Sequence, residues 1–273
     1  MFGIQPAIEQ FTMYTPKHAS TEVSSSSKQI RLLLMGIPGS GKTYSTVTTF
    51  PNPVVLNVDN NCDNKDILAL KPIIIPFYRP EVRQAVSPGT FKKGKPCMAD
   101  SISIWLNTEG SQLTSEQTLI IDSVSTIADG VSEDLWATVP IGKDGEPNGF
   151  VYYDLWADWW CGFCTILKDK LQCNVVMIMH EEEIRDKETG RVLKYEWLLE
   201  GKKFSPRMGQ FFTDVFRASV LTKESGGTEK PQVERVFRWQ VMPDDKFPQC
   251  KTRINTKEKF VPATYKSFKE YTV

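Results

Sequence analysis

The stretch Gly36-Ile37-Pro38-Gly39-Ser40-Gly41-Lys42-Thr43 decides how the rest of the chain is interpreted. It fits the pattern G-x-x-x-x-G-K-[ST] at every fixed position. An apolar run of strand length ends at Met35, and a run compatible with a helix extends from Lys42 to Thr49, before Pro51. The pattern requires this strand–loop–helix context, so the sequence predicts a loop whose backbone N–H groups bind phosphate. A glycine-rich turn without a ligand is the alternative.

The residue types of this loop indicate a nucleoside triphosphate bound together with Mg²⁺. Glycines allow the tight backbone curve, and the helix that follows adds its positive dipole end to the anion site. Lys42 is expected to reach the β- and γ-phosphates, and the Thr43 hydroxyl to bind Mg²⁺. The predicted nucleotide contacts are Gly36, Ile37, Pro38, Gly39, Ser40, Gly41, Lys42, Thr43 and Tyr44.

A second part of the nucleotide site is predicted at Asp122. Four largely apolar residues, 118–121, precede it in a run typical of a buried strand. A carboxylate at such a strand end holds Mg²⁺ directly or through water in nucleotide-hydrolysing proteins. A plain strand-end turn is the weaker alternative, and we expect Thr43 and Asp122 to share the metal.

Composition limits the class of protein and its surroundings. The chain has 273 residues, of which 40% are hydrophobic and 24% charged, which describes an ordinary globular protein. Lys+Arg and Asp+Glu are equal at 33 each, so a nucleic-acid surface must be local. No secretory signal and no apolar run of membrane-spanning length is visible, which predicts a cytoplasmic protein that has no membrane contact and keeps its thiols reduced. Residues 1–28 are expected to be a flexible tail, and 29–273 one domain.

The pattern of apolar runs predicts an α/β fold. The expected strands are 53–59, 72–77, 118–123, 174–180 and a closing pair at 212–222 and 232–242, and the expected helices are 99–109, 124–136 and 153–172. The last helix carries several tryptophans, which are more typical of a core face than of a base-stacking platform. Cys161 and Cys164 lie within it and are expected to be buried thiols, since no second cysteine pair has metal-site spacing.

In the order of these parts the sequence resembles RecA-like ATPase cores, and most of all the compact phage-encoded RecA-like proteins of single-strand annealing and recombination. The resemblance covers roughly 29–222. It implies a mostly parallel central sheet flanked by helices, with antiparallel closing strands near the C-terminus. It also implies that Asp59, where the family usually has glutamate, activates the attacking water. His180, at a predicted strand end, would sense the γ-phosphate, which gives a catalytic set of Lys42, Asp59, Asp122 and His180.

The same resemblance implies that two loops, 139–150 and 181–199, face single-stranded DNA. Six acidic residues outnumber the four basic ones in the second loop, whereas grooves for single strands are usually basic with aromatic platforms. The predicted contacts are Lys143, Phe150, Arg185, Lys187, Arg191, Lys194, Tyr195 and Trp197.

Assembly into a ring or filament is also implied, because ATP sites of this type lie between subunits. A single-strand-binding protein is a further expected partner. A basic residue could also act across a subunit boundary, but each candidate is more simply explained as a solvent-exposed surface residue. The candidates are Lys202, Lys203, Arg207 and Arg253.

Three hypotheses for function remain open at this point. The first is an Mg²⁺-dependent ATPase acting on single-stranded DNA in recombination, annealing or replication. The second is an ATP-gated module that binds DNA or protein with little turnover, which the aspartate at position 59 favours. The third is a ring translocase or helicase-type motor.

Overall fold

The computed structural model describes residues 29–59, 62, 65–76, 98–142, 145–199, 204–225 and 232–271. The predicted flexible tail, Lys143, Lys202 and Lys203 lie outside the described residues. In the described part of the chain, no helix has both the length and the apolar character to span a bilayer.

The strand that precedes the phosphate loop, β1 (Arg31–Gly36), lies inside a sheet of nine strands among the described residues. The strand order is β3-β2-β4-β5-β1-β7-β8-β9, and β6 pairs with β5. Neighbours from β3 to β7 are parallel, whereas β7–β8, β8–β9 and β5–β6 are antiparallel. The other strands are β2 (Pro53–Asn57), β3 (Ile73–Pro76), β4 (Thr118–Asp122), β5 (Asn174–Arg185), β6 (Val192–Trp197), β7 (Asp214–Ser225), β8 (Gln232–Gln240) and β9 (Phe260–Pro262).

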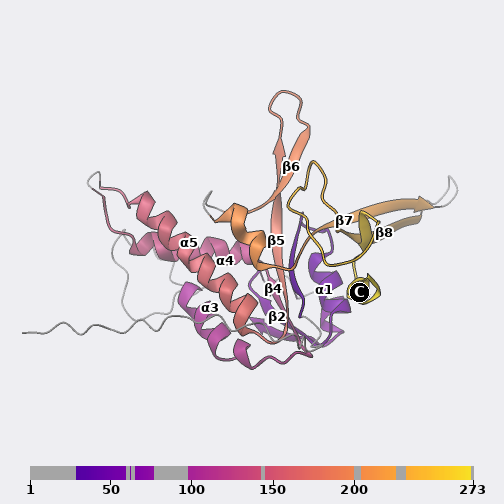
Figure 1. Ribbon diagram of the computed structural model, residues 1–273, viewed down its shortest axis with the longest axis horizontal. Coiled ribbons are helices and arrows are strands. Elements are labelled where there is room, and N and C mark those ends of the chain that lie inside the picture. Colours follow the sequence, from indigo (N-terminus) through magenta and orange to yellow (C-terminus); the bar gives the residue numbers. More distant parts are fainter. Residues whose placement is uncertain are drawn as a thin grey trace, which may run out of the picture.

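Helices cover both faces of the sheet, as Figure 1 shows with α3, α4 and α5 on one side and α1 on the other. The helices are α1 (Lys42–Thr49), α2 (Lys65–Leu68), α3 (Met98–Asn107), α4 (Val124–Thr138), α5 (Gly149–Thr165) and α6 (Lys266–Tyr271). Short helical turns are η2 (Gly110–Gln112), η3 (Ile166–Lys170) and η4 (Ser205–Phe211).

The side chains of β1 pack alternately on the two faces of the sheet, which explains why the described residues form two core clusters. Leu33 and Met35 pack in one core cluster with Trp156 and Trp160 of α5, whereas Leu32 and Leu34 pack in a second cluster on the face of α1. Successive strand residues point to opposite faces, and a strand buried on both faces is therefore apolar throughout. The expected α/β fold with a mostly parallel sheet and antiparallel closing strands is confirmed.

The long helix differs from its prediction. It begins at Gly149 rather than at 153, because the Asn148 side chain accepts hydrogen bonds from the N–H groups of Phe150 and Val151. Its last turn, Ile166–Lys170, is π-helical. Leu155, another apolar residue of the predicted helix, is 38% exposed, whereas Trp156 and Trp160 are buried. The tryptophans of this helix that face the sheet are thus core residues, as expected.

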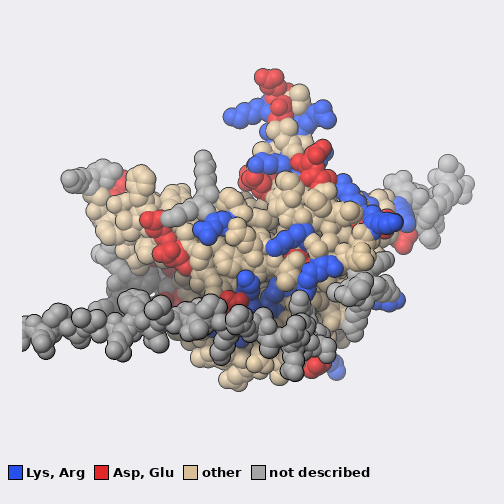
Figure 2. Space-filling view, in the orientation of Figure 1, with Lys and Arg blue, Asp and Glu red and all other residues tan. Residues whose placement is uncertain are grey.

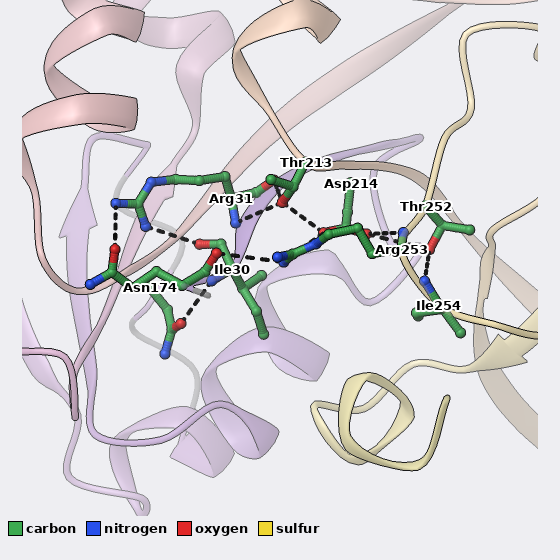
Figure 3. Close-up of polar contacts among 9 residues, drawn as sticks. Ile30, Arg31, Asn174, Thr213, Asp214, Thr252, Arg253 and Ile254 are labelled. Atoms are coloured by element: carbon green, nitrogen blue, oxygen red, sulfur yellow. Dashed lines mark hydrogen bonds and ion pairs between the residues drawn. The ribbon is translucent and has the colours of Figure 1, made fainter. Parts of the chain in front are cut away.

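A polar network joins the amino ends of β1, β5 and β7 to the C-terminal segment (Figure 3). Arg31 donates to the carbonyl oxygens of Leu171 at 2.5 Å and Cys173 at 2.6 Å. Asp214, whose side chain is fully buried, accepts from the backbone N–H of Arg253 at 2.8 Å and from its Nε at 3.2 Å. The network holds the end of the sheet opposite the phosphate loop.

Replacing Asp214 with alanine is expected to lower the free energy of unfolding by about 2–3 kcal/mol, since four donors lose a buried acceptor. The guanidinium of Arg253 is 26% exposed and can turn to solvent, which keeps the loss below that of a fully buried pair. Urea unfolding measures the change, with exposed Asp158→Ala as the control. Equal midpoints for the two variants would contradict the role given to this network.

Candidate nucleotide site

The phosphate loop connects β1 to α1 in a conformation that requires glycine at two positions. Gly39 and Gly41 have φ angles of 77° and 79°, in the left-handed region. A Cβ atom added to Gly41 would lie 2.3 Å from a ring carbon of Phe237, so β8 packs directly against the loop. The loop therefore takes the tight curve that the sequence pattern predicts.

The start of α1 fits an anion. Gly41 caps the helix without a side-chain hydrogen bond, and the first turn carries no acidic residue. Helix N–H groups that no side chain caps attract phosphate, together with the positive end of the helix dipole. The Lys42 ammonium lies across the loop and donates to the carbonyl oxygens of Gly36 at 2.7 Å and Ile37 at 2.8 Å. These residues fit a bound triphosphate.

Burial sets the charge state of Lys42. The residue is 6% exposed, and loss of water lowers its pKa to about 8, against the opposing pull of Asp122, Glu181 and Asp59. A polyphosphate would add negative charge beside the ammonium and favour its protonated form. The site without ligand thus lacks the negative charge of a polyphosphate, which would favour the protonated form of Lys42.

Thr43 and Asp122 meet, as predicted for a shared metal ion. The Thr43 hydroxyl donates to Oδ2 of Asp122 at 2.5 Å. Burial raises the pKa of the Asp122 carboxyl, and the hydrogen bond from Thr43 partly offsets this rise. Hydroxyl and carboxylate oxygens are ligands that Mg²⁺ accepts, with water and substrate phosphates completing its octahedron. Both residues therefore fit Mg²⁺, which would screen phosphate charge here.

Asp59 and His180 lie beside this pair. Nε2 of His180 is 3.5 Å from Oδ2 of Asp59, and the backbone N–H of Asp59 donates to the Asp122 carbonyl at 3.3 Å. Burial opposes ionisation of Asp59, but hydrogen bonds from His180, Thr126 and Ser123 outweigh it and lower the pKa of Asp59 to about 2. The structure brings together Lys42, Thr43, Asp59, Asp122 and His180 at the carboxyl edge of the parallel sheet.

His180 does not end its strand, contrary to the prediction. It pairs with Gly36 at the last parallel position of β1 and β5, and β5 then continues to Arg185 as one arm of a hairpin with β6. The hairpin rises from the body of the molecule in Figure 1. Asp186 accepts hydrogen bonds from the N–H groups of Glu188 and Thr189 in its turn. The predicted second loop is therefore a β-hairpin.

Charges on this hairpin are mixed, as its two colours in Figure 2 show. Arg185 pairs with Glu183, and Lys194 pairs with Glu196. Lys187 and Arg191 are exposed near the turn, and the structure records no ion pair for either among the described residues. Two of the four predicted basic contacts that lie on the hairpin are thus neutralised within it.

The predicted aromatic contacts separate into three cases. Phe150, at the start of α5, is 90% exposed and available to a base. Tyr195 is partly buried, and the guanidinium carbon of Arg217 lies 3.5 Å from the centre of its ring. Trp197 is 6% exposed, and its indole N–H donates to the Ser205 carbonyl at 3.0 Å. The prediction that Trp197 stacks on a base is wrong, because the ring packs in the core.

The candidate arginines for action across a subunit boundary differ in their surroundings, and so do the cysteines of α5. Arg253 is held by Asp214, so this guanidinium is not free to act across a subunit boundary, whereas Arg207 is exposed. Cys164 is buried, which raises the pKa of its thiol, and Cys161 is half-buried. Among the described residues, no group of three or more His, Cys, Asp or Glu side chains could hold a metal ion.

Sequence reasoning missed the pair formed by Glu181 and Arg217. Nε and Nη2 of Arg217 each donate to a Glu181 carboxylate oxygen at 2.8 Å, and the Glu181 side chain is fully buried. Glu181 directly follows His180, and Arg217 lies opposite Met35 in the β1–β7 register. No sequence signal links the two positions, because Arg217 lies 36 residues after Glu181, on a different strand.

The chain was compared with curated proteins and with solved structures. A search of curated proteins finds no match. Among solved structures, a prototypical ATPase from the type III secretion system of pathogenic bacteria has 13% identity and a TM-score of 0.36, over 69% of this chain and 50% of that one. This chain thus spans half of that protein. Flagellar accessory protein FlaH from Methanocaldococcus jannaschii has 10% identity and a TM-score of 0.35, over 85% of this chain and 84% of its own.

Those two likenesses are too distant to bear on what this chain binds. A family model described as AAA domain matches residues 28–244, which include β1 to β8 and every residue of the site above. The chain therefore belongs to the AAA domain family, as a P-loop ATPase domain.

Proposed function

We propose that this protein hydrolyses Mg²⁺-ATP and uses the nucleotide to control its contact with single-stranded DNA in recombination, annealing or replication. One observation carries the proposal: β5 joins the nucleotide site to an exposed hairpin without interruption. His180 lies beside Asp59 within the site, and Arg185 of the same strand lies at the far end of the hairpin. A change at the phosphate can therefore reach the hairpin through one element.

The Glu181–Arg217 pair supports this coupling. Glu181 adjoins His180 and holds Arg217, whose guanidinium covers the ring of Tyr195 on β6. A buried carboxylate, a guanidinium and an aromatic ring thus connect both hairpin strands to the sheet beside the phosphate loop. The charge of Glu181 also opposes the lowering of the Lys42 pKa that burial causes.

The charges of the hairpin set the expected strength of DNA binding. Lys187 and Arg191, together with the exposed ring of Phe150, are the described groups available to a single strand. Two phosphate contacts predict a weak salt dependence, with a slope of log affinity against log salt of about −1.4. Phe150 would add stacking on one base.

Fluorescence anisotropy with labelled single- and double-stranded DNA tests the proposal, with and without a non-hydrolysable ATP analogue. We expect single-stranded DNA to bind more tightly when the analogue is present. The double variant Lys187→Ser/Arg191→Ser is expected to lose about tenfold in affinity at low salt. The charge-matched control Lys65→Ser/Lys257→Ser, at exposed positions elsewhere, is expected to bind like the wild type. If neither form of DNA binds under any of these conditions, the DNA part of the proposal is wrong and the ATPase part remains.

A second candidate, an ATP-gated binding protein with little turnover, is favoured by the state of Asp59. A carboxylate with a pKa of about 2 is a weak base at neutral pH, and its hydrogen bonds to His180, Thr126 and Ser123 compete with a water molecule. Steady-state hydrolysis with and without single-stranded DNA separates the two functions. Strong stimulation by DNA supports the motor or recombinase reading, whereas DNA binding gated by ATP at negligible turnover supports the second.

Self-association into a ring or filament is a further proposal. Arg207 is the exposed member of the described candidates for a residue that reaches a neighbouring ATP site, because Asp214 holds Arg253. Sedimentation with and without the ATP analogue would report the assembly, and a single-strand-binding protein remains a proposed partner.

A further inference from the structure

Two aromatic side chains lie beside the phosphate loop, on the side away from the catalytic residues. Phe237 of β8 contacts Gly41, the residue that caps α1. Tyr44, in the first turn of α1, is 43% exposed, and its ring centre is 6.0 Å from that of Phe237. Phe237 itself is partly buried against the core cluster on the face of α1. The pair thus presents aromatic surface next to the loop.

The order of the strands gives the bound nucleotide a direction. On one side of β1 lie β5 and β4, which carry His180 and Asp122, and on the other side lie β7 and β8. A terminal phosphate that meets Thr43, Asp122 and His180 points towards β4 and β5. The nucleoside at the other end of the phosphate chain must then leave the loop towards β7 and β8, where Phe237 and Tyr44 lie.

We propose that Phe237 and Tyr44 form the nucleobase site, and that the site takes a purine by stacking. This inference rests on the proposed binding of a nucleoside triphosphate at the loop. Aromatic rings stack on the π-face of a base, and the larger purine offers more of that face than a pyrimidine does. Stacking does not distinguish the hydrogen-bonding edges of adenine and guanine, so ATP and GTP should depend on the pair to the same extent.

A purely structural role for Phe237 makes a different prediction. Because its ring supports Gly41, a change at Phe237 that only loosened the loop would weaken every ligand of the loop, including phosphate without a nucleoside. A base contact affects only ligands that carry a base. Inorganic tripolyphosphate, which has the phosphates and neither ribose nor base, distinguishes these roles.

The experiment is calorimetric titration of the full chain with ATP, GTP and tripolyphosphate. Phe237→Leu keeps an apolar side chain against the core, and we expect it to weaken ATP and GTP by about tenfold while tripolyphosphate stays within about twofold. Phe260→Leu is the matched control, since Phe260 lies on β9, below Arg238, and should leave all three ligands unchanged. Tyr44→Leu, at an exposed position, should repeat the loss for ATP and GTP.

Each other outcome overturns the inference. Equal loss for ATP and tripolyphosphate in Phe237→Leu would give the ring only a supporting role, and unchanged ATP binding would remove it from the site. Thermal unfolding of the unliganded variants shows whether Phe237→Leu is folded, and Tyr44→Leu decides if it is not. If the wild type binds neither ATP nor tripolyphosphate, the proposed nucleotide function fails together with this site. Wild-type ATP binding that neither aromatic variant changes removes the base site alone.

Discussion

Lys42→Ala is expected to lower ATP hydrolysis by at least about a hundredfold, with a matching loss of nucleotide affinity. The Lys42 ammonium lies across the phosphate loop, and its present acceptors are two carbonyl oxygens that a phosphate can replace without unfolding the loop. Alanine at position 42 keeps the helix start, because α1 begins there with no side-chain cap to lose. The effect therefore falls on ligand binding and catalysis rather than on the fold.

Phosphate release under steady-state conditions measures this change, and calorimetry with ATP gives the affinity. Lys65→Ala, at an exposed position of α2, removes the same charge away from the loop and should leave both quantities unaltered. Wild-type hydrolysis by Lys42→Ala would mean that the loop does not hold the reacting phosphates, and the proposed ATPase function would fail at its centre.

Asp122→Asn is the second large effect, with hydrolysis again expected to fall by about a hundredfold. The asparagine side chain has the same shape and still offers an oxygen to the Thr43 hydroxyl, so the contact of 2.5 Å can persist. What is lost is the charge that attracts Mg²⁺. Raising the Mg²⁺ concentration should therefore recover part of the activity, which a mere packing defect would not allow.

The same variant makes a prediction of opposite sign for stability. Burial raises the pKa of Asp122, which means that the folded protein without ligand disfavours the charged carboxylate relative to the unfolded chain. Neutral asparagine removes that cost at pH 7, so unliganded Asp122→Asn should unfold at the same temperature as the wild type or higher. Asp158→Asn, on the exposed side of α5, serves as the control. Lower stability with full activity would contradict the proposed role.

Those parts of the site that follow from strand ends were predictable from sequence. The loop at Gly36–Thr43 and the carboxylate of Asp122 each follow an apolar run, and parallel strands bring their carboxyl ends to one edge. The meeting of Thr43 with Asp122 is thus a consequence of the predicted topology, whereas His180, which meets Asp59, lies within β5 and not at a strand end. Antiparallel closing strands were likewise visible as two alternating runs.

Contacts that depend on register between distant strands were not predictable. Phe237 reaches Gly41 only because β8 pairs with β7, which in turn pairs with β1. Trp197 was expected to be an exposed aromatic residue in a polar loop, yet it pairs with buried Glu181 at the base of the hairpin and donates a hydrogen bond to Ser205 of η4. Whether such a residue is buried depends on which elements of the fold cover it, and the composition of its own segment does not predict this.

The unbroken course of β5 has a mechanical consequence. This strand has parallel neighbours on both sides up to Met177, only β1 from there to His180, and only β6 beyond, so it can pivot where the parallel pairing ends. Arg185 is five residues further on, which is about 17 Å of extended chain. A tilt of about 10° at the pivot would move the far end by about 3 Å over this length. Gain or loss of the γ-phosphate would thus move the far end of the hairpin. The displacement would be about as large as the spacing between stacked bases.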